Sequence, residues 1–216
     1  MKRHFMNSIW VAGFMLVSGM FNTIAWAGDA VPAPDKVVEN VARQVLSDLD
    51  KNRETYRKDS VQLRQMIDKY FLTNFDTEYA AQLVLAKNWR TASAEQRKQF
   101  IDAFYQSLLQ NYGNSLLDFT ADRLKILPYQ GKSADTTATV RSEIRRDNGS
   151  KVPVNYTMRL TSSGWKAYDI TIEGISYVKS FRTDFGAEID QKGLDAVIKR
   201  LQTQQAAPAS GSKKSG

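Results

Sequence analysis

The chain has 216 residues, 42% of them hydrophobic and 25% charged, which is enough for one folded domain with its own core. It contains no cysteine, and its single histidine is His4, so a disulfide framework, thiol chemistry and sites built on histidine or cysteine are excluded from the rest of the chain. The formal net charge is +7, or +5 without Lys2 and Arg3, which is too small to predict nucleic-acid binding.

Residues 1–27 have the three regions of a secretory signal peptide. A basic start precedes an apolar run from Ile9 to Met20, and Ala25-Trp26-Ala27 matches a cleavage site. The apolar run is shorter than the roughly 20 residues of a membrane-spanning helix. We therefore predict cleavage after Ala27, export of the chain, and a flexible lead-in over residues 28–34.

Four helices are predicted next. Asp35 is expected to cap the first, whose apolar residues recur at helical spacing to about Lys51. The second covers about residues 61–74, and the third begins after Asp76 as its N-cap. The fourth begins at the capping box of residues 93–96 and runs at least to Tyr112.

The spacing of the apolar residues then changes from about every 3.6 residues to every second residue. This change predicts strands over residues 124–129, 136–146, 152–160 and 164–173. Asn148-Gly149 predicts a hairpin with a type I′ turn. Alternation in the last strand places Tyr168, Ile170 and Ile172 on one face and Ala167, Asp169, Thr171 and Glu173 on the other. Helices are expected over residues 175–189 and 194–201, followed by a disordered tail over residues 204–216.

This order predicts one α+β domain over residues 35–203, in which N-terminal helices pack on a curved antiparallel sheet of about four strands. A single sheet faced by helices leaves room for an apolar cavity, and ligand cavities typically measure about 300–1,000 Å³. The candidates to line it are the apolar side chains on the facing surfaces of these elements: Tyr70, Phe71, Phe75, Tyr79, Leu83, Val84, Phe104, Leu108, Tyr112, Val140, Val154, Tyr156, Met158, Tyr168, Ile170, Ile172 and Val178.

Asp169 and Glu173 are the carboxylates considered for catalysis. They are four residues apart on one strand, about 13 Å, which is too far for a glycosidase pair. Tyr168 and Asp169 face opposite sides unless a bulge intervenes. We favour structural roles, in which Asp169 bonds neighbouring strands and Glu173 caps the next helix. Nucleotide-binding and nucleophile-elbow motifs are also absent, so an enzyme is not expected.

Four segments carry a family resemblance: residues 91–97 (TASAEQR), 165–169 (WKAYD), 172–176 (IEGIS) and 192–195 (KGLD). Together they resemble the toluene-tolerance, or MlaC, family of periplasmic phospholipid-binding proteins of Gram-negative bacteria, over about residues 35–203. The resemblance implies a nuclear-transport-factor-like cone with an apolar cavity. Acyl chains of a diacyl glycerophospholipid would lie in that cavity, with the headgroup at its mouth.

The resemblance also implies a function and partners. The protein would be a monomeric periplasmic carrier that shuttles phospholipid between the outer and inner membranes and maintains outer-membrane lipid asymmetry. It would exchange lipid with an outer-membrane lipoprotein-porin complex and with an inner-membrane ABC transporter bearing an MCE-domain subunit. Phospholipid would be its cargo, with no cofactor, catalytic residue, metal or nucleic acid.

Two other hypotheses are kept. One is an exported α+β enzyme that acts on a hydrophobic small molecule, with Asp169 or Glu173 as a base in the pocket. The other is a periplasmic chaperone or adaptor whose apolar surface binds protein, which predicts an exposed apolar groove instead of an enclosed cavity.

Overall fold

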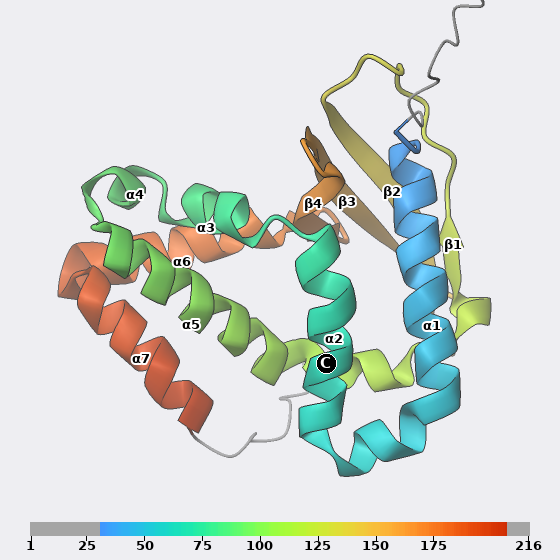
Figure 1. Ribbon diagram of the computed structural model, residues 1–216, viewed down its shortest axis with the longest axis horizontal. Helices are drawn as coiled ribbons and strands as arrows, with labels where there is room; N and C mark the ends of the chain where they lie inside the picture. The colour runs from blue at the N-terminus through green and yellow to red at the C-terminus, as the bar shows by residue number, and fades with distance from the viewer. Residues whose placement is uncertain (1–30, 207–216) are drawn as a thin grey trace, which may run out of the picture. The chain divides into compact units, whose positions relative to one another are not determined.

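The computed structural model describes residues 31–206, so the predicted signal peptide, residues 28–30 and most of the predicted tail lie outside the described residues. Five α-helices and two 3₁₀ turns precede the sheet (Figure 1). In chain order they are α1 (Pro34–Lys58), α2 (Ser60–Asn74), α3 (Thr77–Leu85), α4 (Lys87–Thr91), α5 (Ala94–Tyr112), η1 (Gly113–Asp118) and η2 (Ala121–Arg123).

The helix starts follow from capping residues. Asp76 accepts a hydrogen bond from the Tyr79 N–H, and Ser93 with Gln96 forms a reciprocal capping box, so both predicted caps are confirmed. The predicted cap at Asp35 is wrong. Pro34 occupies the first helical turn, where its fixed φ suits the helix, and α1 therefore begins before Asp35.

Ala86, between α3 and α4, adopts φ 48° and ψ −113°, a backbone conformation that residues with a Cβ avoid. We expect Ala86→Gly to raise the free energy of unfolding by about 1 kcal/mol, because relief of this strain outweighs the greater freedom of glycine in the unfolded chain. Urea unfolding measures the change. Ala187→Gly, at an exposed helical position, is the matched control and should lose about 1 kcal/mol. Equal losses in both variants would contradict the assignment of strain.

The sheet is an antiparallel meander in the order β1-β2-β3-β4-β5, which confirms the predicted α+β class. Five strands form where about four were predicted, because the Glu173-Gly174 turn folds a two-residue strand back on β4. Both turn residues have positive φ, 51° and 83°, as a tight hairpin requires. The strands are β1 (Leu124–Ile126), β2 (Thr137–Arg145), β3 (Lys151–Thr161), β4 (Gly164–Ile172) and β5 (Ile175–Ser176).

The β2–β3 hairpin has the predicted position but a different turn. Gly149 has φ 80°, whereas Asn148 has no positive φ, so the turn is not type I′. The Gly149 N–H donates to the Arg146 carbonyl, and the Arg146 N–H donates to the Ser150 carbonyl. These bonds are typical of a type I turn followed by a glycine bulge.

A bulge in β4 changes the predicted faces of that strand. Asp169 pairs with Thr157 and Ala167 pairs with Met158, so Tyr168 is an extra residue of β4 that has no partner in β3. Alternation restarts beyond the bulge. Ala167 and Ile170 therefore share the inner face, and the predicted grouping of Tyr168 with Ile170 is wrong.

Two helices follow the sheet, α6 (Tyr177–Lys192) and α7 (Leu194–Ala206), the second of which extends past the predicted domain end at residue 203. α5 and α7 lie side by side, and with α3 and α6 they enclose a helix core centred on the fully buried Phe100 (Figure 1). α1, α2 and η1 pack against one another, and α1 also packs against the inner face of the sheet. Among the described residues, no helix is both long and apolar enough to cross a bilayer.

Candidate functional site

An apolar cavity of about 260 Å³ lies between α1, α2 and the inner face of the sheet. α1 supplies one continuous face, because positions three and four apart on a helix lie on the same side. α2 supplies the opposite wall, and the sheet supplies the third. The α1 face consists of Val37, Val38, Val41, Ala42, Val45, Leu46 and Leu49.

Six of the predicted lining residues surround this cavity: Tyr70, Phe71, Phe75, Tyr156, Met158 and Ile170. Tyr156 and Met158 lie there because the inner face of β2 and β3 alternates as predicted, with Tyr156 opposite Val140 and Met158 opposite Ala138. Tyr70, Phe71 and Phe75 come from the end of α2. Phe71 stacks on Phe75 with ring centroids 4.3 Å apart, which gives this wall a rigid aromatic surface.

The other predicted lining residues lie elsewhere. Val84, Phe104 and Val178 are buried in the helix core, with Leu83 and Leu108 packed against it. Val140 and Val154 are buried within the sheet, and Ile172 pairs with Ile175 of β5. The remaining three make ring contacts outside the cavity lining: Tyr79 with Tyr168, and the half-exposed Tyr112 with Tyr177.

Sequence reasoning missed Met66, Ile67, Asn74, Leu124 and Ile144, and three further groups of lining residues. The apolar face of α1 is visible in its helical spacing, but the spacing alone does not say what that face contacts. Leu116 and Phe119 follow α5 in an irregular segment that has no periodic signal. Ala167 was assigned to the other face, because the bulge at Tyr168 leaves no mark in the apolar pattern.

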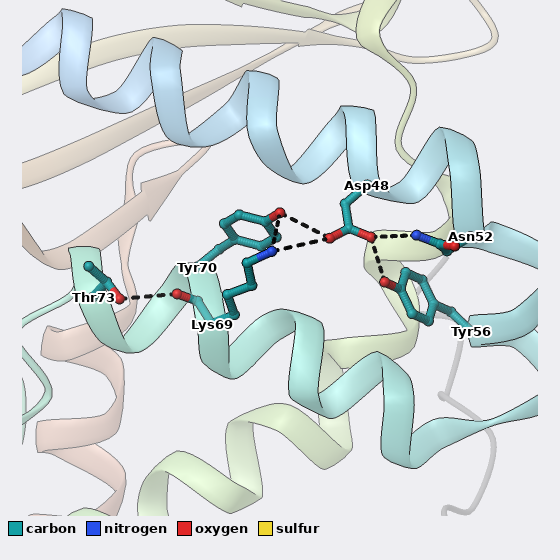
Figure 2. Close-up of polar contacts among 6 residues, drawn as sticks. All are labelled: Asp48, Asn52, Tyr56, Lys69, Tyr70 and Thr73. Atoms are coloured by element: carbon teal, nitrogen blue, oxygen red, sulfur yellow. Dashed lines mark hydrogen bonds and ion pairs between the residues drawn. The ribbon is translucent and has the colours of Figure 1, made fainter.

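A polar cluster joins α1 to α2 at the edge of the cavity (Figure 2). Asp48 accepts hydrogen bonds from the Tyr56 hydroxyl at 2.5 Å and the Asn52 amide at 2.8 Å. Its second oxygen accepts from the Tyr70 hydroxyl at 2.9 Å and lies 4.0 Å from Lys69 Nζ. Because Tyr70 also lines the cavity, this cluster fixes the position of one wall relative to another.

Burial and this cluster shift two pKa values. Burial, followed by the hydrogen bond to Asp48, raises the pKa of Tyr56 to about 12. Burial also acts to raise the pKa of Asp48, but the hydrogen bonds from Tyr56, Asn52 and Tyr70 together hold that pKa below its ordinary value. Asp48 is therefore ionised, and Tyr56 protonated, at neutral pH.

We expect Asp48→Asn to lower the free energy of unfolding at neutral pH by about 1–3 kcal/mol, because a partly buried hydroxyl loses its acceptor. Since folding lowers the pKa of Asp48, its stabilisation is complete above the unfolded pKa and is lost as pH falls through the folded pKa. The difference between wild type and variant should therefore shrink on acidification, as followed by urea unfolding. Asp50→Asn, at an exposed site paired with Arg53, is the control, and a pH-independent deficit in Asp48→Asn would refute the argument.

Neither carboxylate considered for catalysis is among the residues that line the cavity. Asp169 is buried and accepts hydrogen bonds from the Ser176 hydroxyl at 2.6 Å and the Val178 N–H at 3.0 Å, so it links β4 to the neighbouring strand β5 and to the first turn of α6, whose N-cap is Ser176. Glu173 pairs with Arg146 at 3.2 Å, and the predicted cap at Glu173 is wrong. Within residues 31–206, no group of three His, Cys, Asp or Glu side chains could hold a metal ion.

The cavity adjoins the surface in two directions. A groove of about 780 Å³ between α1 and β1 shares Ala42, Leu46 and Leu124 with it. A second groove, of about 400 Å³ near the β2–β3 hairpin, shares Phe119 and Ile144. An elongated apolar molecule in the cavity could therefore extend a polar end to the surface.

Known proteins resemble the chain over nearly all of the described region. The model of the family described as MlaC protein matches residues 39–203. The toluene tolerance protein ttg2D of Pseudomonas putida is 26% identical over 167 residues, which cover 77% of each chain. The intermembrane phospholipid transport system binding protein MlaC of Haemophilus influenzae is 24% identical over 182 residues, or 83% of this chain and 85% of that protein.

A solved structure shares the fold. It is a phospholipid-binding protein from Ralstonia solanacearum in complex with a phospholipid, with a TM-score of 0.75 and 23% sequence identity. The match covers 81% of this chain and 98% of the other chain.

Proposed function

Because the chain belongs to the MlaC family, we propose that it binds the acyl chains of a diacyl glycerophospholipid in the cavity between α1, α2 and the sheet, and that it transports the lipid. The observation that carries the proposal is this cavity, whose lining is aliphatic and aromatic except for Asn74 and the tyrosine hydroxyls. The Ralstonia solanacearum protein of the same fold was solved with a phospholipid, which supports this ligand class.

The length of the cavity suits an acyl chain. The lining face of α1 runs from Val37 to Leu49, a rise of about 18 Å along the helix axis. One leaflet of a bilayer has a hydrocarbon layer of about 15 Å. The volume of about 260 Å³ is small for two chains, so we propose that a diacyl lipid also uses the adjoining groove between α1 and β1.

Transport requires that the chains stay covered. Each buried CH₂ contributes about 0.8 kcal/mol, so two chains of roughly 16 carbons represent on the order of 25 kcal/mol. We propose a monomeric periplasmic carrier, exported through a cleaved signal peptide, that moves lipid between the outer and inner membranes and maintains outer-membrane lipid asymmetry. Its exchange partners would be an outer-membrane lipoprotein-porin complex and an inner-membrane ABC transporter with an MCE-domain subunit.

The proposed activity is binding and release without catalysis. Asp169 and Glu173 are both engaged in structural contacts, which disfavours the alternative of a carboxylate base in the pocket. The sequence carries no nucleotide-binding motif, so a partner would supply the energy for any directional transfer.

The test is native mass spectrometry of the full chain expressed in a Gram-negative host, with lipid extraction of the same sample. We expect a protein mass that corresponds to cleavage after Ala27, together with a bound mass that resolves into diacyl phospholipid at a fixed ratio. A folded protein that carries no phospholipid, even after incubation with phospholipid vesicles, would overturn the proposal.

A further inference from the structure

The groove near the β2–β3 hairpin joins an apolar floor to charged walls. Phe119 and Ile144 form the floor and also line the cavity. Around them lie three guanidinium groups and two carboxylates, and two further carboxylates, Asp122 and Glu173, pair with Arg145 and Arg146 from outside the lining. The charged and polar lining residues are Asp118, Arg123, Arg145, Arg146, Asp147 and Asn148.

The three arginines are available to an anion. The structure gives each an ion pair through Nη2: Arg123 with Asp147, Arg145 with Asp122, and Arg146 with Glu173. A guanidinium has five N–H donors, so each keeps further donors for a ligand. The arginine side chains are 34%, 57% and 53% exposed, and such surface ion pairs contribute little, typically 0–1 kcal/mol. A stronger acceptor could therefore displace or join these carboxylates at small cost.

The fold holds these arginines on short, hydrogen-bonded elements. Arg145 ends β2, and Arg146 is bonded through its backbone to both Gly149 and Ser150 in the turn. Arg123 ends η2 and directly precedes β1, which pairs with β2. The guanidinium groups therefore extend from backbone that is already ordered, which favours binding of a ligand between them.

The other groove, between α1 and β1, differs in the kind of basic group. Its lining has one guanidinium, that of Arg43, so it offers a single group that can bind a phosphate through paired hydrogen bonds. Its charged lining residues are Asp35, Glu39, Asp50, Lys36, Arg43 and Lys51.

We propose that the arginine groove, defined by Arg123, Arg145 and Arg146 around Phe119 and Ile144, binds the phosphate ester of a phospholipid headgroup whose acyl chains occupy the cavity. This inference rests on the proposed function. Planar guanidinium groups match the oxygens of a phosphate in paired hydrogen bonds, and the shared apolar floor places such a phosphate where the cavity meets the surface.

The first experiment compares three ligands of the wild-type protein by calorimetry: dioctanoyl phosphatidylglycerol, dioctanoyl glycerol and inorganic phosphate. We expect the phospholipid to bind at least tenfold more tightly than the diacylglycerol, and its advantage to decrease with added salt. Inorganic phosphate should bind far more weakly than the phospholipid, because it lacks the chains.

The second experiment uses the variant Arg123→Gln/Arg145→Gln/Arg146→Gln. It should lose the tenfold preference while its affinity for dioctanoyl glycerol stays within about twofold of wild type. The matched control removes three exposed arginines outside the cavity and its grooves, Arg57→Gln/Arg64→Gln/Arg90→Gln, and should keep the preference.

The outcomes separate this inference from the proposed function. Equal affinity of the wild-type protein for the two lipids would overturn the phosphate site but not the proposed carrier function. A preference for the phospholipid that survives the triple substitution would have the same meaning. Inorganic phosphate that binds as tightly as the phospholipid would overturn the headgroup assignment in favour of a free-anion site. No binding of either lipid would overturn the proposed function itself. The wild-type comparison needs no variant, so it decides the matter even if the triple variant does not fold.

Discussion

Replacement of Ala167 by phenylalanine is expected to remove bound phospholipid from the protein almost completely. Ala167 lies opposite Met158 on the inner face of the sheet and lines the cavity. A cavity of about 150 Å³ accommodates a benzene ring, so a phenyl group would fill a large part of the about 260 Å³ available. We expect phospholipid occupancy to fall at least tenfold, because the acyl chains and the ring compete for the same volume.

The same substitution should leave the fold intact. Ala167 accepts the hydrogen bond from the Asp76 N–H through its backbone oxygen, which does not depend on the side chain. The ring enters existing space instead of a close-packed core, so the loss of stability expected from overpacking should be small.

Occupancy is measured by native mass spectrometry after incubation with phospholipid vesicles, and stability by urea unfolding. Ala187→Phe makes the same substitution at an exposed position of α6 and should bind lipid as wild type does. If Ala167→Phe stays folded and retains full occupancy, the lipid does not lie in this cavity.

The order of the longer helices and strands was predictable because each has a local period, whereas the five-residue α4 and the two-residue β5 were not predicted because they are too short to show one. The inner faces of β2 and β3 follow from alternation alone, and the capping box at Ser93 marks the start of α5 without reference to any distant residue. The bulge at Tyr168 was not predictable in this way, because a bulge is a property of two paired strands. Because of this one extra residue, Ala167 lies on the inner face of the sheet and lines the cavity.

The lining of the cavity was only partly predictable, because local periodicity shows that a face is apolar and not which element covers it. Phe71 and Phe104 both lie on apolar helix faces. Phe71 borders the cavity, whereas Phe104 is buried between α5 and α6, 5.0 Å from the ring of Phe181. The division of the apolar residues into a helix core and a cavity wall depends on contacts between distant segments.

Phe100→Ala tests whether these two regions are independent. Phe100 is completely buried in the helix core, with its ring 5.6 Å from that of Phe104 and 5.7 Å from that of Phe185. Removal of a fully packed phenyl ring typically lowers the free energy of unfolding by about 3–5 kcal/mol, a large fraction of the roughly 5–15 kcal/mol that stabilises a domain. Urea unfolding should show this loss, while the protein that remains folded should bind phospholipid with unchanged occupancy.

Phe71→Ala is the matched comparison, because the same side chain is removed from the cavity wall. One side of Phe71 already faces empty space, so its ring has fewer partner atoms to lose and the destabilisation should be smaller than in Phe100→Ala. Its phospholipid occupancy should change instead, because the wall that contacts the chains is altered. Of the residues named for the two regions, only Phe75 both lines the cavity and packs against the helix core. Few direct contacts therefore couple the cavity to the helix core. Parallel losses of stability and occupancy in both variants would show that the helix core and the cavity behave as one unit.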